Sequence, residues 1–428
     1  MDLFRLRDAG TTVRTEVLAG FTTWLAMVYI VAVNPSILAT TGMDQGAVFV
    51  ATCLGAGFAS LAMGLYANYP LALAPGMGLN AYFAFVVVGG MQVPWQVALG
   101  AVFLSGVLFL IVSLLRLREW LINAIPLSLK LGIGAGIGFF LALIGLERMG
   151  VVAASPATLV TLGHLGHPAT LLSCAGFLLI AALAARGIAA AVLIGILATA
   201  AAGLPFGLTG LHGALSLPPS LAPTLMQMDI PGALSLGLVS IVLTFFLVDL
   251  LDNAGTLIAV THQAGLTRLD GTVPRLGQVL AADSGGAILG AALGTSTVTS
   301  YIESAAGIQA GGRTGLTAVT TGVLFLATLF FAPLALSLPD FATAPALLFV
   351  ACLMARALRD LDWDDLTDAL PAVATALTMA FTYSIAAGIG LGFIVYAAVK
   401  TLAGRPREVS GAVWLIAAAS ALKFAIQP

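Results

Sequence analysis

The sequence predicts an all-α polytopic membrane protein, and its composition, hydropathy pattern and placement of basic residues support this fold class. Of 428 residues, 60% are hydrophobic and only 8% are charged, whereas a soluble domain carries about 25% charged residues. So few charges cannot cover a globular surface with polar groups. Because about 20 apolar residues cross the hydrocarbon core of a bilayer, the chain is long enough for a dozen or more spans.

The hydropathy pattern predicts 14 transmembrane segments in two groups of seven. The first seven are expected near residues 17–38, 46–67, 71–89, 96–115, 127–146, 168–186 and 188–204. The second seven are expected near residues 233–257, 276–293, 295–310, 314–337, 342–358, 365–383 and 385–402. A further apolar stretch, 409–427, either crosses the membrane or lies on its surface, and the sequence leaves this open.

The basic residues determine the orientation, because Lys and Arg favour the cytoplasmic side of short loops. With a cytoplasmic amino terminus in the cell (inner) membrane, 15 of the 17 Lys and Arg residues fall inside, and only Arg148 falls outside. An odd number of spans per half also inverts the second half relative to the first. We therefore predict two inverted repeats, at 1–204 and 232–402. An extracytoplasmic loop at 205–231 connects them, and an apolar helix or tail follows at 403–428.

Two of the predicted spans are broken. The third contains PGMG at 75–78 and the tenth contains GTSTVTS at 294–300, so each is expected to cross as an extended piece followed by a half-helix. Unpaired backbone groups are tolerated at membrane depth only inside protein or beside a cavity, and secondary transporters often bind substrate at such breaks between inverted repeats. The breaks therefore predict a polar site, although small residues can also serve close helix packing.

Faint internal similarity accompanies the breaks. A shift of 219 residues aligns Tyr82 with Tyr301 and Asn34 with Asn253. The aligned residues fall in or near the segments where a site is expected. This similarity supports the prediction of two repeats.

Four acidic residues lie within apolar runs, namely Asp249, Asp252, Asp283 and Glu303. A carboxylate in hydrocarbon costs several kcal/mol, so these side chains are expected to face the protein interior and to be functional. Asp249 and Asp252 are three residues apart and share a helix face. A carboxyl group there can exchange a proton and accept hydrogen bonds from ring N–H groups. Alternatively, the pair only braces two helices.

The remaining polar candidates follow the breaks. Glu303 is expected in the first turn of a half-helix, where the helix dipole favours a negative charge. Asn80 offers both a donor and an acceptor to an amide-like ring. Each could instead only cap its own half-helix, and we expect a scaffold role for Asp283.

Several other classes of protein are excluded or disfavoured. No basic stripe indicates a nucleic-acid partner, and the three cysteines are isolated within apolar runs, so no disulfide framework, metal site or cofactor is expected. All four histidines, His164, His167, His212 and His262, lie in predicted loops or at span ends. A membrane-embedded hydrolase based on histidine therefore lacks its residues, and two aspartates on one helix are poorly placed to hold one water. A passive channel is disfavoured because no span carries a polar stripe.

Five long motifs resemble those of AzgA-like purine permeases, a branch of the nucleobase/cation symporter family two. They are TEVLAGFTTWLAMVYIVAVNP, NYPLALAPGMGLNAYF, VDLLDNAGTL, GTSTVTSYIESAAGIQAGGRTGLTAV and LPDFATAPAL. The resemblance extends from about Glu16 to Lys400. It implies 14 segments in two inverted repeats of seven, a core and a gate domain, and short β-strands in segments three and ten. It also implies inward transport of hypoxanthine, guanine or adenine together with protons.

The resemblance assigns roles to individual residues. It places the acids of segment eight at Asp249 and Asp252, the glutamate of segment ten at Glu303 and the asparagine of segment three at Asn80. All four are expected to bind substrate, and the three acids are expected to take part in proton coupling.

More distant uracil and xanthine carriers of the same fold add three residues. Their Glu-His-Ile-Gly-His stretch aligns with DNAGT, which places Asp252 on the glutamate and Thr256 on the second histidine. Their Tyr-Gly-Glu aligns with SYIE, which places Tyr301 against the ring and Ile302 where a backbone amide contacts the base. Because Thr256 and Ile302 depart from that pattern, recognition cannot copy the uracil carrier. The division of roles between Asp249 and Asp252 stays open.

The combined prediction is a proton-coupled importer of purine nucleobases that acts in a lipid bilayer. The nearest alternative is an anion transporter or exchanger of the same architecture, which would need a positively charged site. Four buried acids and no buried base are expected, and this disfavours it. The sequence leaves open the preferred purine, sodium as the coupling ion, and the oligomeric state, including a homodimer.

Overall fold

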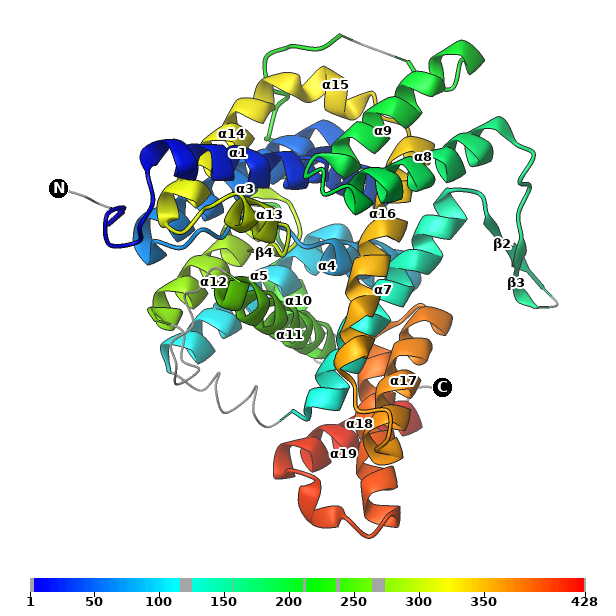
Figure 1. The fold of residues 1–428 in the computed structure, drawn as a ribbon. Coiled ribbons are helices and arrows are strands. Elements are labelled where there is room, and N and C mark those ends of the chain that lie inside the picture. The colour runs from blue at the N-terminus through cyan, green and yellow to red at the C-terminus, as the bar shows by residue number, and fades with distance from the viewer. Residues whose placement is uncertain are drawn as a thin grey trace. The chain divides into compact units, whose positions relative to one another are not determined.

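The computed structural model describes residues 4–115, 125–156, 158–210, 213–235, 239–263 and 274–426. Within these ranges, the side chains of residues 251, 252, 254, 255, 258–263, 423 and 426 lie outside the description. The chain divides into two compact units (Figure 1). Unit 1 contains Met1–Arg116 and His164–Ala346, and unit 2 contains Leu117–Gly163 and Leu347–Pro428. Each unit therefore takes residues from both predicted repeats.

The first part of unit 1 is helical apart from one short strand. Its elements are α1 (Val13–Met27), α2 (Ile30–Ala39), α3 (Gln45–Ala62), η1 (Met63–Ala67), β1 (Leu73–Pro75), α4 (Met77–Ala81), η2 (Tyr82–Gly90) and α5 (Trp95–Leu114). The first predicted span is thus two helices, separated at Val28 and Tyr29. Hydropathy alone does not detect this interruption, because the apolar run continues through it from Val13 to Ala39.

The second part of unit 1 begins after residue 163. Its elements are α8 (Pro168–Ala185), α9 (Ala191–Ala202), η3 (Leu204–Phe206), α10 (Ile230–Ala233), α11 (Val239–Gln263), α12 (Leu276–Leu293), β4 (Val298–Ser300), α13 (Ser304–Gln309), α14 (Gly315–Thr328), η4 (Leu329–Phe331) and α15 (Ala332–Leu336). In Figure 1, α1 and α3 lie beside α14, and both pack against it. The boundary between the units falls within α16 (Asp340–Ala355).

Unit 2 contains a helix bundle and a hairpin. Its further elements are α7 (Leu127–Arg148), β2 (Val152–Ser155), β3 (Leu159–Leu162), η5 (Arg356–Asp360), α17 (Leu366–Phe381), α18 (Ile385–Leu402), η6 (Pro406–Glu408) and α19 (Gly411–Ile426). Helices α7 and α18 both pack against α17, and α19 packs against α18. The antiparallel hairpin of β2 and β3 was not predicted. Helix α19 lies within the predicted apolar stretch 409–427.

Within the described ranges, nine helices are long and apolar enough to cross a membrane. Several shorter apolar helices accompany them, including Met77–Gly90, Ala191–Phe206 and Leu366–Phe381. The chain is therefore a multi-pass membrane protein of mainly helical fold. The 14-segment count itself stays a prediction.

The two predicted breaks meet in space. Strand β1 pairs antiparallel with β4 in the register Leu73↔Ser300, Ala74↔Thr299 and Pro75↔Val298. The ladder is extended by Gly76 N–H to the Thr297 carbonyl (2.9 Å) and by Tyr301 N–H to the Ala72 carbonyl (3.0 Å). This pairing satisfies backbone groups that lipid could not satisfy. Each strand is followed by a short helix, α4 or α13, so the prediction of an extended piece and a half-helix is confirmed.

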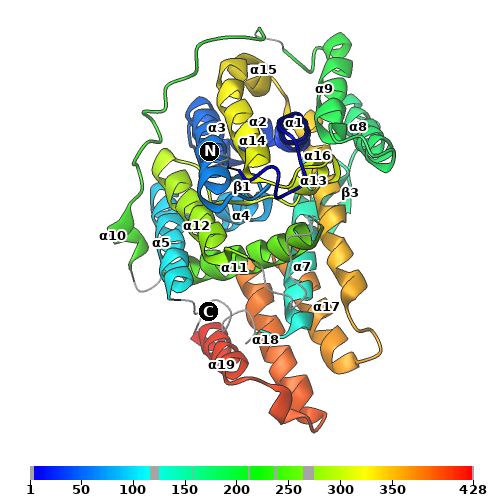
Figure 2. The ribbon, with the colours of Figure 1, turned by 60° about the vertical axis from the view of Figure 1, so that its left-hand side comes forward.

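Small residues allow helices to approach the paired strands. A Cβ atom added at Gly290 of α12 would lie 2.7 Å from the Val298 side chain and 2.9 Å from the Ser296 carbonyl. On α3, a Cβ at Gly55 would lie 3.2 Å from Val298. Helix α12 also packs against α5, which Figure 2 shows beside it. Glycine is therefore required where α12 contacts the second break.

The connecting segment, residues 213–229, runs without helix along unit 1 (Figure 2). It is held at several points by backbone hydrogen bonds. Met226 N–H donates to the Ala292 carbonyl at the end of α12 (2.7 Å), and Asp229 N–H donates to the Gln96 carbonyl of α5 (2.8 Å). The Thr224 hydroxyl donates to the Leu293 carbonyl (3.0 Å). The segment therefore satisfies carbonyls at the carboxyl end of α12, immediately before the second break.

Candidate functional site

Glu303 lies at the start of a half-helix, as predicted. It is the N-cap residue of α13, and two residues separate it from the end of β4. Its Oε1 atom accepts a hydrogen bond from the Tyr29 hydroxyl at 2.8 Å. A negative charge at this end of a helix is favoured by the backbone N–H groups of the first turn. The carboxylate is thus placed between the second break and the interruption between α1 and α2.

Sequence reasoning missed Tyr29. The residue lies in the apolar run VYIVAV and is one of seven tyrosines in the chain. No local pattern distinguishes it, because its hydrogen bond to Glu303 spans 274 residues of sequence. The only feature of the sequence that could have indicated Tyr29 is its hydroxyl group, which lies within the first predicted span, 17–38.

Asn80 connects the two breaks. It lies in α4, is fully buried, and its Oδ1 atom accepts a hydrogen bond from the Ser296 hydroxyl. Its side-chain nitrogen lies 3.5 Å from the Pro75 carbonyl. These partners are not the amides of the first turn of α4, so the alternative in which Asn80 only caps its own half-helix does not describe its contacts. Ser296 is a second residue that sequence reasoning missed.

Tyr301 is directed at the first break. Its side chain is 5% exposed, and its hydroxyl donates to the Pro75 carbonyl at 2.5 Å. The next residue, Ile302, has a side chain that is 50% exposed. Tyr301 therefore ties the second break to the last residue of β1. It directly follows β4, whereas Tyr82 lies beyond α4, so the two tyrosines aligned by the 219-residue shift occupy different positions relative to the strands.

Helix α11 carries the predicted acidic pair beside both breaks. It packs against α4, β4 and α13. Asp249 is fully buried and Thr256 is 7% exposed, whereas the side chain of Asp252 lies outside the described residues. One turn before Asp249, the ring of Phe245 packs edge-on against Tyr82, with 4.9 Å between centroids. The structure therefore brings the helix of Asp249 together with the segments of Asn80, Tyr301 and Glu303.

Asp283 supports the strand. Its Oδ1 atom accepts from the Ser300 N–H (2.9 Å) and the Ser300 hydroxyl (2.7 Å), and its Oδ2 atom accepts from the Asn253 amide. It is fully buried. These contacts join α11, α12 and the end of β4, which agrees with the expected scaffold role.

The two asparagines aligned by the internal shift make comparable contacts. The amide of Asn34 on α2 donates to the Thr52 hydroxyl on α3 and to the Thr295 hydroxyl before β4, both at 2.8 Å. The amide of Asn253 on α11 donates to Asp283 on α12. Each asparagine therefore joins its helix to the next long helix in the chain, as expected if the two halves share a plan.

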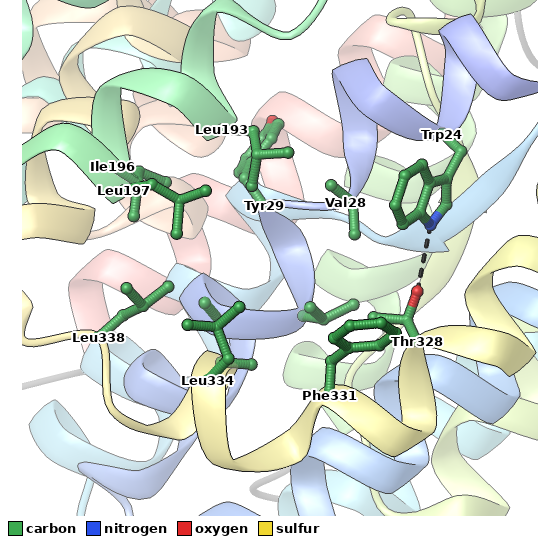
Figure 3. Close-up of a pocket in the computed structure, with 13 residues that line it drawn as sticks. Trp24, Val28, Tyr29, Leu193, Ile196, Leu197, Thr328, Phe331, Leu334 and Leu338 are labelled. Carbon is green, nitrogen blue, oxygen red and sulfur yellow. Dashed lines mark hydrogen bonds between the residues drawn. The ribbon is translucent and has the colours of Figure 1, made fainter. Parts of the chain in front are cut away.

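An apolar cavity of about 210 Å³ is lined in part by Tyr29, whose hydroxyl donates to Glu303. Figure 3 shows its lining residues, which include Trp24, Leu193, Phe331 and Leu334. The indole N–H of Trp24 donates to the Thr328 hydroxyl at 3.2 Å, and the Tyr29 hydroxyl donates to Glu303. Polar groups of the lining are thus engaged with protein, so this cavity is unsuited to reading a polar heterocycle. The polar side chains at the breaks suit that task better.

The site is rich in acceptors and hydroxyl groups. The sequence has no Lys or Arg between residues 239 and 263 or between 276 and 309. Carboxylate oxygens accept N–H bonds, and an amide both donates and accepts. Among the described residues, no group of three or more His, Cys, Asp or Glu side chains is placed to hold a metal ion. The arrangement therefore suits a neutral ligand with N–H donors better than an anion.

Comparison with known proteins gives one family and several relatives. A family model described as "Permease family" matches residues 14–391. The adenine permease AdeP of Escherichia coli (strain K12) is 49% identical over 422 residues, covering 99% of this chain and 95% of that protein. The guanine/hypoxanthine permease PbuG of Bacillus subtilis (strain 168) is 45% identical over 421 residues, covering 95% of both chains.

Among solved structures, the transmembrane domain of a cyanobacterial bicarbonate transporter, BicA, superposes with a TM-score of 0.67. The alignment covers 88% of this chain and 96% of that one, at 17% identity. Identity this low shows a shared fold alone.

Proposed function

The chain belongs to the permease family whose model it matches, and from this premise we propose that it is a proton-coupled symporter that imports purine nucleobases. It is a membrane permease and not an enzyme. Its high identity to an adenine permease and a guanine/hypoxanthine permease confirms the resemblance to AzgA-like purine permeases. These relatives support a purine as the substrate.

The observation that carries the proposal is Glu303 at the start of α13, bonded to Tyr29 and beside the two paired breaks. A purine carries ring N–H donors and ring or exocyclic acceptors. In the proposed complex Glu303 accepts a ring N–H, Asn80 contacts an exocyclic group, and Tyr301 and the backbone at Ile302 border the ring. Thr256 and the acids of α11 complete the site.

Proton coupling is assigned to the acids at membrane depth. Asp249, Asp252 and Glu303 are carboxyl groups that can exchange a proton as the site changes access. In this proposal 1–204 and 232–402 act as inverted repeats, a core moves against a gate, and the amino terminus lies in the cytoplasm of the cell membrane.

The alternative, an anion transporter, is suggested by the fold that this chain shares with BicA. At 17% identity, however, a shared fold does not indicate a shared substrate. An anion would have to bind beside Asp249 and Glu303, in segments without Lys or Arg. Like charges at such short range are repulsive. A purine therefore fits the residues better.

Uptake of labelled adenine and labelled hypoxanthine tests the function, in cells that lack their own purine carriers. We expect unlabelled adenine, guanine or hypoxanthine to compete with the labelled purine for uptake. Bicarbonate should leave uptake unchanged, and a protonophore should abolish it. Dependence on external sodium instead of the proton gradient would contradict proton coupling alone.

Variants test the site in the same cells. The double variant Asp252→Asn with Glu303→Gln should lose uptake, whereas Asp229→Asn in the connecting segment should retain it. Undiminished purine uptake by the double variant would contradict the proposed site. Absence of purine uptake by the wild-type protein, when membrane expression is normal, would contradict the proposed function.

A further inference from the structure

Tyr29 makes a contact that differs from those of two other buried tyrosines in unit 1. The hydroxyls of Tyr69 and Tyr301 donate to backbone carbonyls, of Pro274 and Pro75 respectively. The hydroxyl of Tyr29 donates to the carboxylate of Glu303 at 2.8 Å. A hydrogen bond to a charged acceptor is shorter and about twice as strong as one between neutral groups. Tyr29 is therefore bonded to the side chain that the proposed function depends on.

The fold holds Tyr29 firmly in this position. The residue is 2% exposed and lies where α1 ends and α2 begins. Five residues earlier, Trp24 is anchored to Thr328 by its indole N–H. Tyr29 and Leu193 of α9 are both among the residues that line the apolar cavity (Figure 3). Because the ring is packed and the hydroxyl is engaged, the phenol is a fixed donor for one oxygen of Glu303.

A carboxylate has two oxygens and about four acceptor sites. A donor that fixes one oxygen leaves the group able to accept a further N–H bond in a defined orientation. We propose that Tyr29 is a positioning residue for substrate recognition, which orients Glu303 so that its carboxylate accepts a ring N–H of the purine. This inference rests on the proposed function and adds a residue from the interruption between α1 and α2 to the site. Tyr29 acts through Glu303 and does not itself contact the base.

The test compares Tyr29→Phe with Tyr69→Phe. Both variants remove one hydroxyl from a buried ring in unit 1; the Tyr29 hydroxyl donates to Glu303, and the Tyr69 hydroxyl donates to the Pro274 carbonyl. For labelled adenine or hypoxanthine we expect Tyr29→Phe to raise KM about tenfold, the effect of about 1.4 kcal/mol in binding free energy, with Vmax within about twofold of wild type. Tyr69→Phe should leave KM within about twofold. A role confined to folding would lower the amount of protein, and hence Vmax, without changing KM.

A second measurement tests the bond without substrate. Thermal unfolding midpoints of purified wild type, Tyr29→Phe, Glu303→Gln and the double variant form a cycle. We expect the two single effects to be non-additive, because both variants alter the same hydrogen bond. Additive effects would show that Tyr29 and Glu303 do not act together.

The outcomes separate the two proposals. If the wild-type protein takes up purine and Tyr29→Phe has the same KM, the role of Tyr29 is overturned and the proposed function stands. A lowered Vmax with unchanged KM would overturn it equally. If the wild-type protein reaches the membrane and accumulates no purine, the proposed function fails, and the inference about Tyr29 fails with it.

Discussion

The acids of unit 1 and those of unit 2 have different partners. In unit 1, Glu303 accepts from the Tyr29 hydroxyl and Asp283 accepts from Ser300 and Asn253. In unit 2, the three acids Asp365, Asp368 and Glu408 form an ion cluster with Lys400 and Arg405. Lys400 is only 1% exposed, and its Nζ atom lies 2.9 Å from Asp368 and 3.0 Å from Glu408.

The difference concerns which protonation state the surroundings favour. Hydrogen bonds from Thr367 and from Arg405 hold the pKa of Asp365 well below its usual range. Arg405 and Lys400 likewise lower the pKa of Glu408. These acids therefore stay charged and bind the ends of α17, α18 and η6 together. The Tyr29 hydroxyl supplies no opposite charge to Glu303, so this carboxyl group is better suited than those of the cluster to exchange a proton or a ligand.

The largest expected effect separates the two sets of acids directly. Glu303→Gln should lower purine uptake at least about 100-fold, because it removes the charged acceptor proposed to bind the ring N–H. Glu408→Gln, in the ion cluster, should keep uptake within about threefold of wild type. Initial rates normalised to the amount of protein in the membrane measure both. An equal loss of purine uptake in Glu303→Gln and Glu408→Gln would show that the site and the ion cluster do not differ in their role in transport.

Removing the buried cation should affect stability instead of substrate affinity. Lys400→Met leaves Asp368 and Glu408 without their shared partner. We expect a loss of about 2 kcal/mol in the free energy of unfolding, less than for a fully buried pair because Glu408 is 43% exposed. Lys400→Arg should retain most of the stability. Thermal unfolding and purine binding to the folded fraction provide the measurements, and a changed Kd in Lys400→Met would show that the cluster contributes to the site.

The ion cluster also predicts a dependence of stability on pH. The pKa values of Asp365 and Glu408 are lower in the folded than in the unfolded protein, where they are about 3.9 and 4.3. At a pH between the folded and the unfolded pKa of each acid, the unfolded chain binds more protons than the folded protein. The free energy of unfolding therefore rises with pH in this range. The cluster's contribution is complete above about pH 5 and is lost as pH falls through the folded pKa values.

Unfolding midpoints measured from pH 7 down to pH 3 check this expectation. Asp365→Asn should weaken the decline below about pH 4, whereas Asp364→Asn, an exposed neighbour, should leave it unchanged. The same decline in Asp365→Asn as in wild type would assign the acid sensitivity to other groups.

The smallest expected effect concerns the contact between the breaks. Ser296→Ala removes the hydroxyl that donates to Asn80 and should raise KM for a purine about threefold, because one neutral hydrogen bond contributes about 0.5–1.5 kcal/mol. Ser337→Ala, which removes a hydroxyl bonded to the Pro333 carbonyl, is a matched control. A KM unchanged by Ser296→Ala would place Asn80 outside substrate recognition.

The sequence alone predicted the properties that depend on local composition. Long apolar runs identify a membrane protein because each span must be apolar along its own length. Glycine and threonine at 75–78 and 294–300 indicated the two breaks, and the acids at 249 and 303 stood out against their apolar neighbours. Both breaks were confirmed, because each includes the end of a short strand that is followed by a helix.

Only the tertiary structure decided which distant residues meet. The pairing of β1 with β4 joins segments more than 200 residues apart, and the bond from Tyr29 to Glu303 spans 274. Hydropathy placed Lys400 at the end of a span, but the expectation that no base is buried is wrong for this residue, which is 1% exposed. The acids that surround it could not be identified from the sequence. Hydrophobic patterning reports how each segment is solvated, whereas hydrogen bonds and ion pairs between segments depend on packing, which the order of residues along the chain does not display.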